Sequence, residues 1–123
     1  MGKIVAWGSV FFLASMMLVS SAFADAKKGE ELFKNKGVSK CQICHAIGKK
    51  LVGPDLAGVS KRHTKVWIVK WITDVQGTWT SNDPETLALK KSVKKENAPK
   101  PAHAPPPLSA EQAGDIADFL MTQ

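Results

Sequence analysis

The chain has 123 residues, 17 of them basic and 11 acidic, and carries a formal net charge of +6. This length allows one small domain and excludes two separate hydrophobic cores. The sequence has neither a phosphate-binding glycine loop nor an alternation of strand and helix patterns, which argues against nucleotide chemistry.

Residues 1–24 have the pattern of a secretory signal that is removed from the mature protein. Basic Lys3 precedes an uncharged stretch over 4–19, and the segment ends with small residues, Ala22 and Ala24, at the positions that a signal peptidase recognises. We predict cleavage after Ala24. An uncleaved anchor helix is the alternative, because the apolar stretch is just long enough to cross a bilayer.

The mature domain is predicted to span 25–123, without a further membrane span. An exported domain does not meet chromosomal DNA, so we expect no nucleic-acid partner, and its basic charge suits an acidic protein or an anionic membrane surface. Its first helix is predicted over 26–36, with Asp25 as N-cap and Gly37 as the residue that ends it.

Both cysteines lie in the motif C-x-x-C-H, at Cys41, Cys44 and His45. A disulfide across two residues would close a very small loop and stabilise little. A thioredoxin-like redox pair needs a βαβ context that is absent here. A structural zinc site needs two more ligands at finger-like spacing, which His63 and His103 do not supply. The remaining interpretation is covalent attachment of a c-type haem, for which this motif is typical.

The spacing of the motif has a mechanical reason. Two cysteines three positions apart project from the same side of a helical turn, so both can form thioethers with the vinyl groups of one porphyrin. His45 follows directly and would place its imidazole on the iron as proximal ligand. We therefore predict one covalently bound haem c, held by Cys41, Cys44 and His45.

Further helices are predicted over 65–75, 84–93 and 110–120. Their start signals are Thr64, the Asp83-Pro84 pair, and a capping box from Ser109 to Gln112. The β-branched content of the first of these segments also allows a strand. Residues 48–60 form a glycine-punctuated loop, and residues 97–108 contain five prolines, which exclude a helix and predict a stiff, extended loop. The predicted fold class is all-α, a small domain with loops around a cofactor.

The order of these features resembles the class I (monohaem) cytochrome c family over the whole of 25–123. The matching segments are Gly29-x-x-x-Phe33, Cys41-x-x-Cys44-His45, Gly53-Pro54-Asp55-Leu56, and Leu108-Ser109 leading into Ile116-Ala117-Asp118-Phe119-Leu120. The resemblance implies helices wrapped around one haem, with the first and last helices crossing at Gly29 beside Phe33 and Phe119.

The resemblance also implies roles for three residues after the motif. The carbonyl of Pro54 would hold the proximal imidazole and raise its basicity. Leu56 would pack on the haem, and Arg62 would bind a haem propionate. On turn statistics alone, Pro54 could equally be a simple turn proline.

The sequence departs from the family at the second iron ligand. The family usually has a methionine five residues before the apolar residue that precedes the last helix; counted back from Leu108, that position is His103. The methionine of the mature chain, Met121, lies at the end of the last helix and is badly placed to reach iron. We therefore expect His103 as distal ligand. Alternatives are a solvated His103, ligation by His63 or Lys100, or an open sixth position.

The tryptophans and lysines each have two interpretations. Trp67, Trp71 and Trp79 are expected to pack in the core and the haem pocket, although Trp79 could donate its indole N–H to a propionate. The lysines are either a solvated surface or a basic ring that steers an acidic redox partner. They are Lys27, Lys28, Lys34, Lys36, Lys40, Lys49 and Lys50 near the haem segment, and Lys90, Lys91, Lys94 and Lys95 on one helical face.

The sequence thus predicts a periplasmic one-electron carrier between redox proteins and not an enzyme. Two imidazole ligands would close the iron to substrates and give a lower potential than a methionine ligand. The alternatives are a CO- or NO-binding sensor or scavenger with an open or displaceable sixth position, and a fixed haem subunit of a larger redox complex. The sequence contains no signal for monomer or dimer.

Overall fold

The computed structural model describes Gly2 and residues 17–123, and the side-chain surroundings from Asp25 onward. Most of the predicted signal segment, residues 1 and 3–16, lies outside the described residues, so cleavage after Ala24 stays a prediction. In the described part of the chain, no helix is both long enough and apolar enough to cross a membrane.

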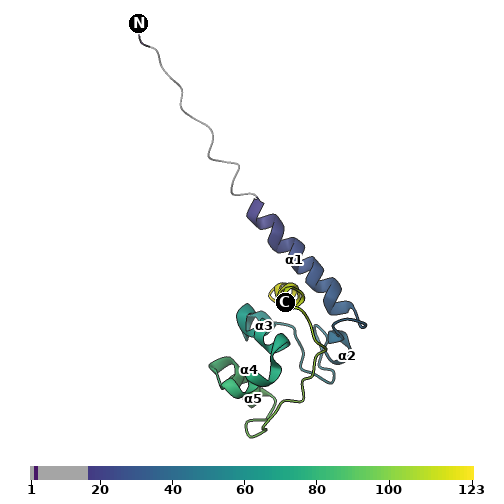
Figure 1. The fold of residues 1–123 in the computed structure, drawn as a ribbon, viewed down its shortest axis with the longest axis vertical. Helices are drawn as coiled ribbons and strands as arrows, with labels where there is room; N and C mark the ends of the chain where they lie inside the picture. Colours follow the sequence, from purple (N-terminus) through teal and green to yellow (C-terminus); the bar gives the residue numbers. More distant parts are fainter. Residues whose placement is uncertain (1, 3–16) are drawn as a thin grey trace.

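The described residues form helices joined by loops, without a β-strand, which confirms the all-α prediction. The elements are α1 (Met17–Lys34), α2 (Cys41–Cys44), the 3₁₀ turn η1 (Val59–Lys61), α3 (Lys65–Thr73), α4 (Val75–Ser81), α5 (Pro84–Ser92) and α6 (Ala110–Leu120). In Figure 1, α6 lies against α1, α3 packs on α6, and α4 and α5 continue away from that pair. A long loop then returns from α5 to α6.

Three predicted helix starts are confirmed by their hydrogen bonds. The side chain of Thr64 accepts from the backbone N–H of Trp67, and Ser109 forms the expected capping box with Gln112. Asp83 caps α5, with proline at the first helical position. These side chains satisfy backbone donors that a helix N-terminus leaves unpaired.

The bounds of α1 and α3 differ from the prediction. The segment predicted over 65–75 is a helix and not a strand, but it ends at Thr73. Asp74 leaves the helical conformation there. Its side chain caps a new helix, α4, by accepting from Gly77 N–H at 2.9 Å.

Helix α1 begins before Asp25, so Asp25 is not an N-cap in the full-length chain. It ends at Lys34 and not at Lys36, because the Asn35 side chain accepts from the backbone N–H groups of Gly37 and Val38 in a turn that follows the helix.

The crossing of α1 and α6 organises the core. Gly29 has no side chain at the crossing point, and a Cβ there would overlap the backbone carbonyl of Asp115. Beside it, the rings of Phe33 and Phe119 pack with centroids 5.4 Å apart. This is the arrangement expected from the sequence resemblance. It fixes the end of α1, from which the cysteine motif follows.

Gly29→Ala should lower the free energy of unfolding by about 1–3 kcal/mol, because the new methyl group forces the two helices apart. Gly114→Ala in α6 is the matched control: its added methyl meets nothing within 4 Å, so helix propensity should make it neutral or stabilising by up to about 1 kcal/mol. Urea unfolding of the two haem-loaded variants measures both effects. Wild-type stability for Gly29→Ala would contradict the close crossing.

Asp83 adds a pH-dependent contribution to stability. Its carboxylate accepts hydrogen bonds from Thr86 N–H, the Thr86 hydroxyl and the Ser81 hydroxyl at 3.0, 2.7 and 2.8 Å. Desolvation acts to raise the pKa of Asp83, but these hydrogen bonds outweigh it and lower the pKa to about 2. A carboxyl group whose pKa is lowered by folding stabilises the fold above its ordinary pKa and loses that effect at lower pH.

Asp83→Asn should therefore reduce the free energy of unfolding near neutral pH, and the difference from wild type should shrink as the pH falls from about 4 towards 2. Urea unfolding at a series of pH values gives both curves. A difference that stays constant across this interval would contradict the assignment.

Candidate functional site

A largely apolar cavity of about 820 Å³ lies between the cysteine motif and the proline-rich loop. One wall comes from α2, His45 and the Gly53-Pro54 turn, and the opposite wall from the loop that carries His103. Trp71, Trp79 and Leu89 from α3, α4 and α5 line it further. A volume of this order is typical of a pocket for a cofactor or other small molecule.

The cysteine motif forms a single helical turn tied to the end of α1. The buried hydroxyl of Ser39 donates to the carbonyl of Leu32 at 2.6 Å and accepts from Cys41 N–H at 3.3 Å. Cys41 and Cys44 are free thiols, both line the cavity, and burial raises the pKa of the Cys41 thiol. Two thiols on the same side of one turn suit attachment to a single planar group. Ser39 was not predicted to have this role, although a serine two residues before the first cysteine is a recognisable capping signal.

His45 follows this turn, and the next loop holds its imidazole. Nδ1 lies 2.9 Å from the carbonyl oxygen of Pro54, and because a carbonyl only accepts, this nitrogen carries the proton. Nε2 then keeps its lone pair for a metal. Gly53 packs directly against the ring, where a Cβ would lie 2.7 Å from Nδ1 and 2.9 Å from Nε2. The structure thus brings together Pro54 and His45, as the family resemblance implied.

The loop around His45 also depends on Asp55, for which the sequence predicted no role beyond its place in the Gly53-Pro54-Asp55-Leu56 segment. Its carboxylate accepts from the backbone N–H groups of Gly48 and Ala57, each at 2.8 Å. The two hydrogen bonds lower the pKa of this exposed carboxyl group. Asp55 therefore closes the loop that carries Pro54.

His103 lies across the cavity from His45. The centroids of the two imidazole rings are 6.1 Å apart and their planes are inclined by 64°. Burial is the main cause that lowers the pKa of His103 to about 4, and repulsion between the two imidazoles when both are protonated adds to it, so His103 is neutral at physiological pH. A neutral imidazole is the form that binds metals.

This separation tests whether the site fits a metal held from two sides. An imidazole nitrogen lies about 2 Å from a bound transition metal, so two imidazoles on opposite sides of one ion hold their ring centroids roughly 6 Å apart. The observed 6.1 Å matches that requirement. The residues present, two thiols on one turn and two facing imidazoles in an apolar cavity, fit a covalently attached haem.

The other residues considered as second iron ligands differ from His103 in their position relative to the cavity. The His63 ring stacks on Trp67, its Nδ1 lies 3.2 Å from a carboxylate oxygen of Glu85, and it does not line the cavity. Met121 packs against the hydrophobic core. Lys100 does line the cavity, in the same loop as His103.

Two residues expected at the haem do not line the cavity, and their contacts with the haem stay predictions. The Arg62 guanidinium donates to the carbonyls of Ala57 and Asp55, each at 2.9 Å, and it does not line the cavity. Leu56 packs partly buried against the hydrophobic core and is also absent from the cavity wall. The indole N–H of Trp79 donates to the carbonyl of Ala98 at 2.9 Å, so it forms a hydrogen bond with the proline-rich loop.

One lysine of the expected basic face is buried. Lys90 Nζ donates to Asn82 Oδ1 at 2.6 Å and lies 4.7 Å from the centroid of a Trp79 ring, as in a cation–π contact. The prediction that Lys90 lies on a solvent-exposed basic face is therefore wrong. Lys91, Lys94 and Lys95 are exposed as expected, but Lys94 and Lys95 follow the end of α5 at Ser92 and do not lie on a helical face.

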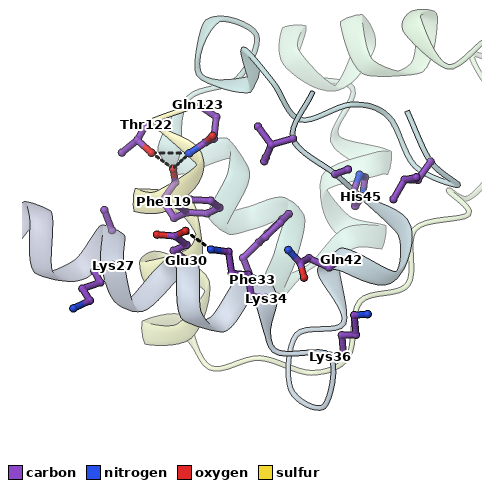
Figure 2. A pocket seen from close by; sticks show the side chains of 14 residues that line it. Lys27, Glu30, Phe33, Lys34, Lys36, Gln42, His45, Phe119, Thr122 and Gln123 are labelled. Atoms are coloured by element: carbon purple, nitrogen blue, oxygen red, sulfur yellow. Dashed lines mark hydrogen bonds and ion pairs between the residues drawn. The ribbon is translucent and has the colours of Figure 1, made fainter. Parts of the chain in front are cut away.

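A second hollow, of about 770 Å³ and more open, lies on the other side of the His45 segment (Figure 2). Phe33 and Phe119 form its apolar floor between α1 and α6, and Lys27, Lys34 and Lys36 stand around it. Lys34 pairs with Glu30 across one helical turn. The hollow thus has a basic rim near the motif but contains no thiol.

Residues 26–123 match the family described as cytochrome c. The chain belongs to the cytochrome c family. Cytochrome c-551 of Azotobacter vinelandii is 32% identical over 95 residues, which cover 76% of this chain and 95% of that protein. Cytochrome c2 of Rhodopseudomonas palustris is 55% identical over 38 residues, which cover 31% of this chain and 29% of that protein.

A solved structure supports the fold. An engineered cytochrome c from Rhodothermus marinus, bound to a carbene intermediate, matches with a TM-score of 0.59 and 23% identity over 98% of this chain and 88% of that one. The family carries one covalently attached haem c, which confirms the cofactor predicted from the motif. Its members transfer electrons between redox proteins and are generally not enzymes.

Gly53→Ala should displace the His45 imidazole, because the added methyl group would overlap the ring. We expect less low-spin haem protein in the absorption spectrum and a free energy of unfolding lower by about 1–3 kcal/mol. Gly37→Ala is the matched control, since the atom nearest to its added methyl, Asn35 Oδ1, is 3.4 Å away. A Gly53→Ala protein with the spectrum and stability of wild type would contradict the close packing of glycine on imidazole.

Proposed function

We propose that the chain is an exported, low-potential, one-electron carrier in which His45 and His103 bind the haem iron from opposite sides. The observation that carries this proposal is the separation of the two imidazole centroids, 6.1 Å across a cavity that both cysteines line. Haem supplies an iron centre that accepts and releases one electron at a time. The chain supplies the ligands, the largely apolar pocket and the surface that meets the partner.

Cys41 and Cys44 are proposed to form the two thioethers, and His45 the proximal bond through Nε2. The hydrogen bond from Nδ1 to the Pro54 carbonyl supports this role, because it selects the required tautomer and increases the basicity of the ligand. Ser39 and Asp55 hold the two ends of this segment.

His103 is proposed as the distal ligand. Its imidazole is neutral, faces the cavity and belongs to a loop stiffened by Pro101, Pro105 and Pro106, which lowers the entropy cost of holding the ring. Replacing a thioether with an imidazole favours the ferric state, so the potential should lie below that of a methionine-ligated relative. Two protein ligands leave no free position for a substrate, which fits a carrier better than a gas-binding sensor.

The surface beside the motif supports docking to an acidic redox protein. Ile43 and Val52 line the cavity and are 53% and 85% exposed, so apolar side chains surround its opening. The exposed lysines Lys40, Lys95 and Lys100 line the same cavity, and Lys36, Lys49 and Lys50 are exposed residues close to the motif in the sequence. An apolar contact area within a basic rim combines close approach with electrostatic steering of an acidic partner.

The proposed location is the periplasm. It is supported by the signal pattern of residues 1–24 and by the attachment motif, because a covalent bond retains the haem outside the cytoplasm.

The distal ligand is tested by electron paramagnetic resonance of the ferric protein. Wild type should give a low-spin spectrum typical of two imidazoles, and His103→Ala should become high-spin and return to a low-spin spectrum when imidazole is added. Lys100→Ala is the control for the other candidate ligand that lines the cavity, and His63→Gln is the control for the other histidine. Both variants should keep the wild-type spectrum. An unchanged low-spin signal in His103→Ala would remove His103 from the iron.

A further inference from the structure

Four aromatic rings form one column that ends on His103. The His103 imidazole stacks on Trp71 with centroids 5.0 Å apart and planes inclined by 9°. Trp71 stacks on Trp67 at 5.3 Å and 13°, and Trp67 on His63 at 3.9 Å and 14°. The two tryptophans are four residues apart in α3, so they share one face of that helix.

The far end of this aromatic column is anchored to α5. The indole N–H of Trp67 donates to the hydroxyl of Thr86 at 3.0 Å, in a buried position. Glu85, the neighbouring residue, lies 3.2 Å from Nδ1 of His63 and also accepts from the backbone N–H of Thr64. The column is therefore fixed by hydrogen bonds at the end away from the cavity, and Trp71 transmits that fixed orientation to His103 by stacking alone.

The two imidazoles at the cavity are held in different ways. His45 donates its Nδ1 proton to the Pro54 carbonyl. Among the described side chains, Nδ1 of His103 is buried and has no hydrogen-bond partner. Histidines that bind metals almost always have the second ring nitrogen hydrogen-bonded, and this bond fixes the orientation of the ring. His103 lacks that support, so another contact must set the plane of its ring.

We propose that Trp71 is the positioning residue of the distal ligand: its stacked indole, in place of a hydrogen bond, sets the plane of the His103 imidazole and hence its angle to the His45 ring. This inference rests on the proposed function, since it requires His103 to bind the iron. The angle in question is the 64° between the two ring planes.

Two measurable properties depend on that angle and that contact. If both imidazoles bind one iron, their relative orientation would contribute to the splitting of the iron d orbitals, and the g values of the ferric low-spin state would report it. The stack also opposes departure of His103, and an aromatic pair contributes a free energy that corresponds to roughly a three- to tenfold change in an equilibrium. His103 without the stack should therefore yield more readily to an external ligand such as cyanide.

Trp71→Leu and Trp71→Phe in the haem-loaded protein test the proposal. Trp71→Leu should shift the g values and raise the apparent affinity of the ferric protein for cyanide by roughly three- to tenfold. Trp71→Phe retains a flat but smaller ring and should give a smaller shift in the same direction. Ile68→Val is the control for general loosening of α3, because Ile68 is buried in the core outside the column; it should keep the wild-type g values and cyanide affinity.

Wild-type g values and cyanide affinity in both Trp71 variants would overturn the inference, as would an equal change in Ile68→Val. If Trp71→Leu does not fold, the result for Trp71→Phe alone tests the positioning role.

The result for His103→Ala distinguishes failure of the positioning role from failure of the ligand assignment. When that variant loses the low-spin signal but the Trp71 variants match wild type, only the positioning role fails. When His103→Ala keeps the signal, the ligand assignment and the positioning role fail together.

Discussion

The spacing of two imidazoles across an apolar cavity is the constraint on which the rest of the structure depends. His45 and His103 are 58 positions apart in the chain, and both lie in loops, yet their ring centroids are 6.1 Å apart. The helices act as the frame that makes this possible. The α1–α6 crossing at Gly29 fixes the end of α1, to which Ser39 ties the cysteine turn. Helices α3, α4 and α5 supply the remaining wall. Side chains of α3 and α4 contact the loop that returns to α6, through Trp71 on His103 and Trp79 on the Ala98 carbonyl.

The two sides of the site are built by different physical means. On the His45 side, a hydrogen bond to a backbone carbonyl and a glycine packed on the ring control both the proton and the position of the imidazole. On the His103 side, an apolar environment keeps the ring neutral, while prolines and an aromatic column hold it. A hydrogen-bonded imidazole is the more basic ligand. The proposed iron site therefore has a strong ligand next to the attachment motif and a more easily displaced one on the loop.

Local signals were sufficient for part of this structure. The caps at Thr64, Asp83 and Ser109 involve side chains and backbone groups only three residues apart, so the sequence predicts them. Helix α4 was not predicted as a separate helix. Apolar residues continue at helical spacing past Asp74, so the break at Asp74 could not be recognised from the sequence. Burial of Lys90 depends on contacts with Trp79 and Asn82 in a neighbouring helix and loop, which no local pattern reports. The role of His103 as a ligand was predicted from its position relative to the last helix, by resemblance to the family. The aromatic column behind it could not be predicted, because it joins residues from two loops and α3.

Near-infrared magnetic circular dichroism of the ferric, haem-loaded protein tests the central claim most directly, because its charge-transfer band differs between bis-imidazole, imidazole–thioether and imidazole–amine iron. The account predicts the band of two imidazoles from the wild-type chain near neutral pH. A band at the position of thioether or amine ligation, or a high-spin spectrum, would contradict it.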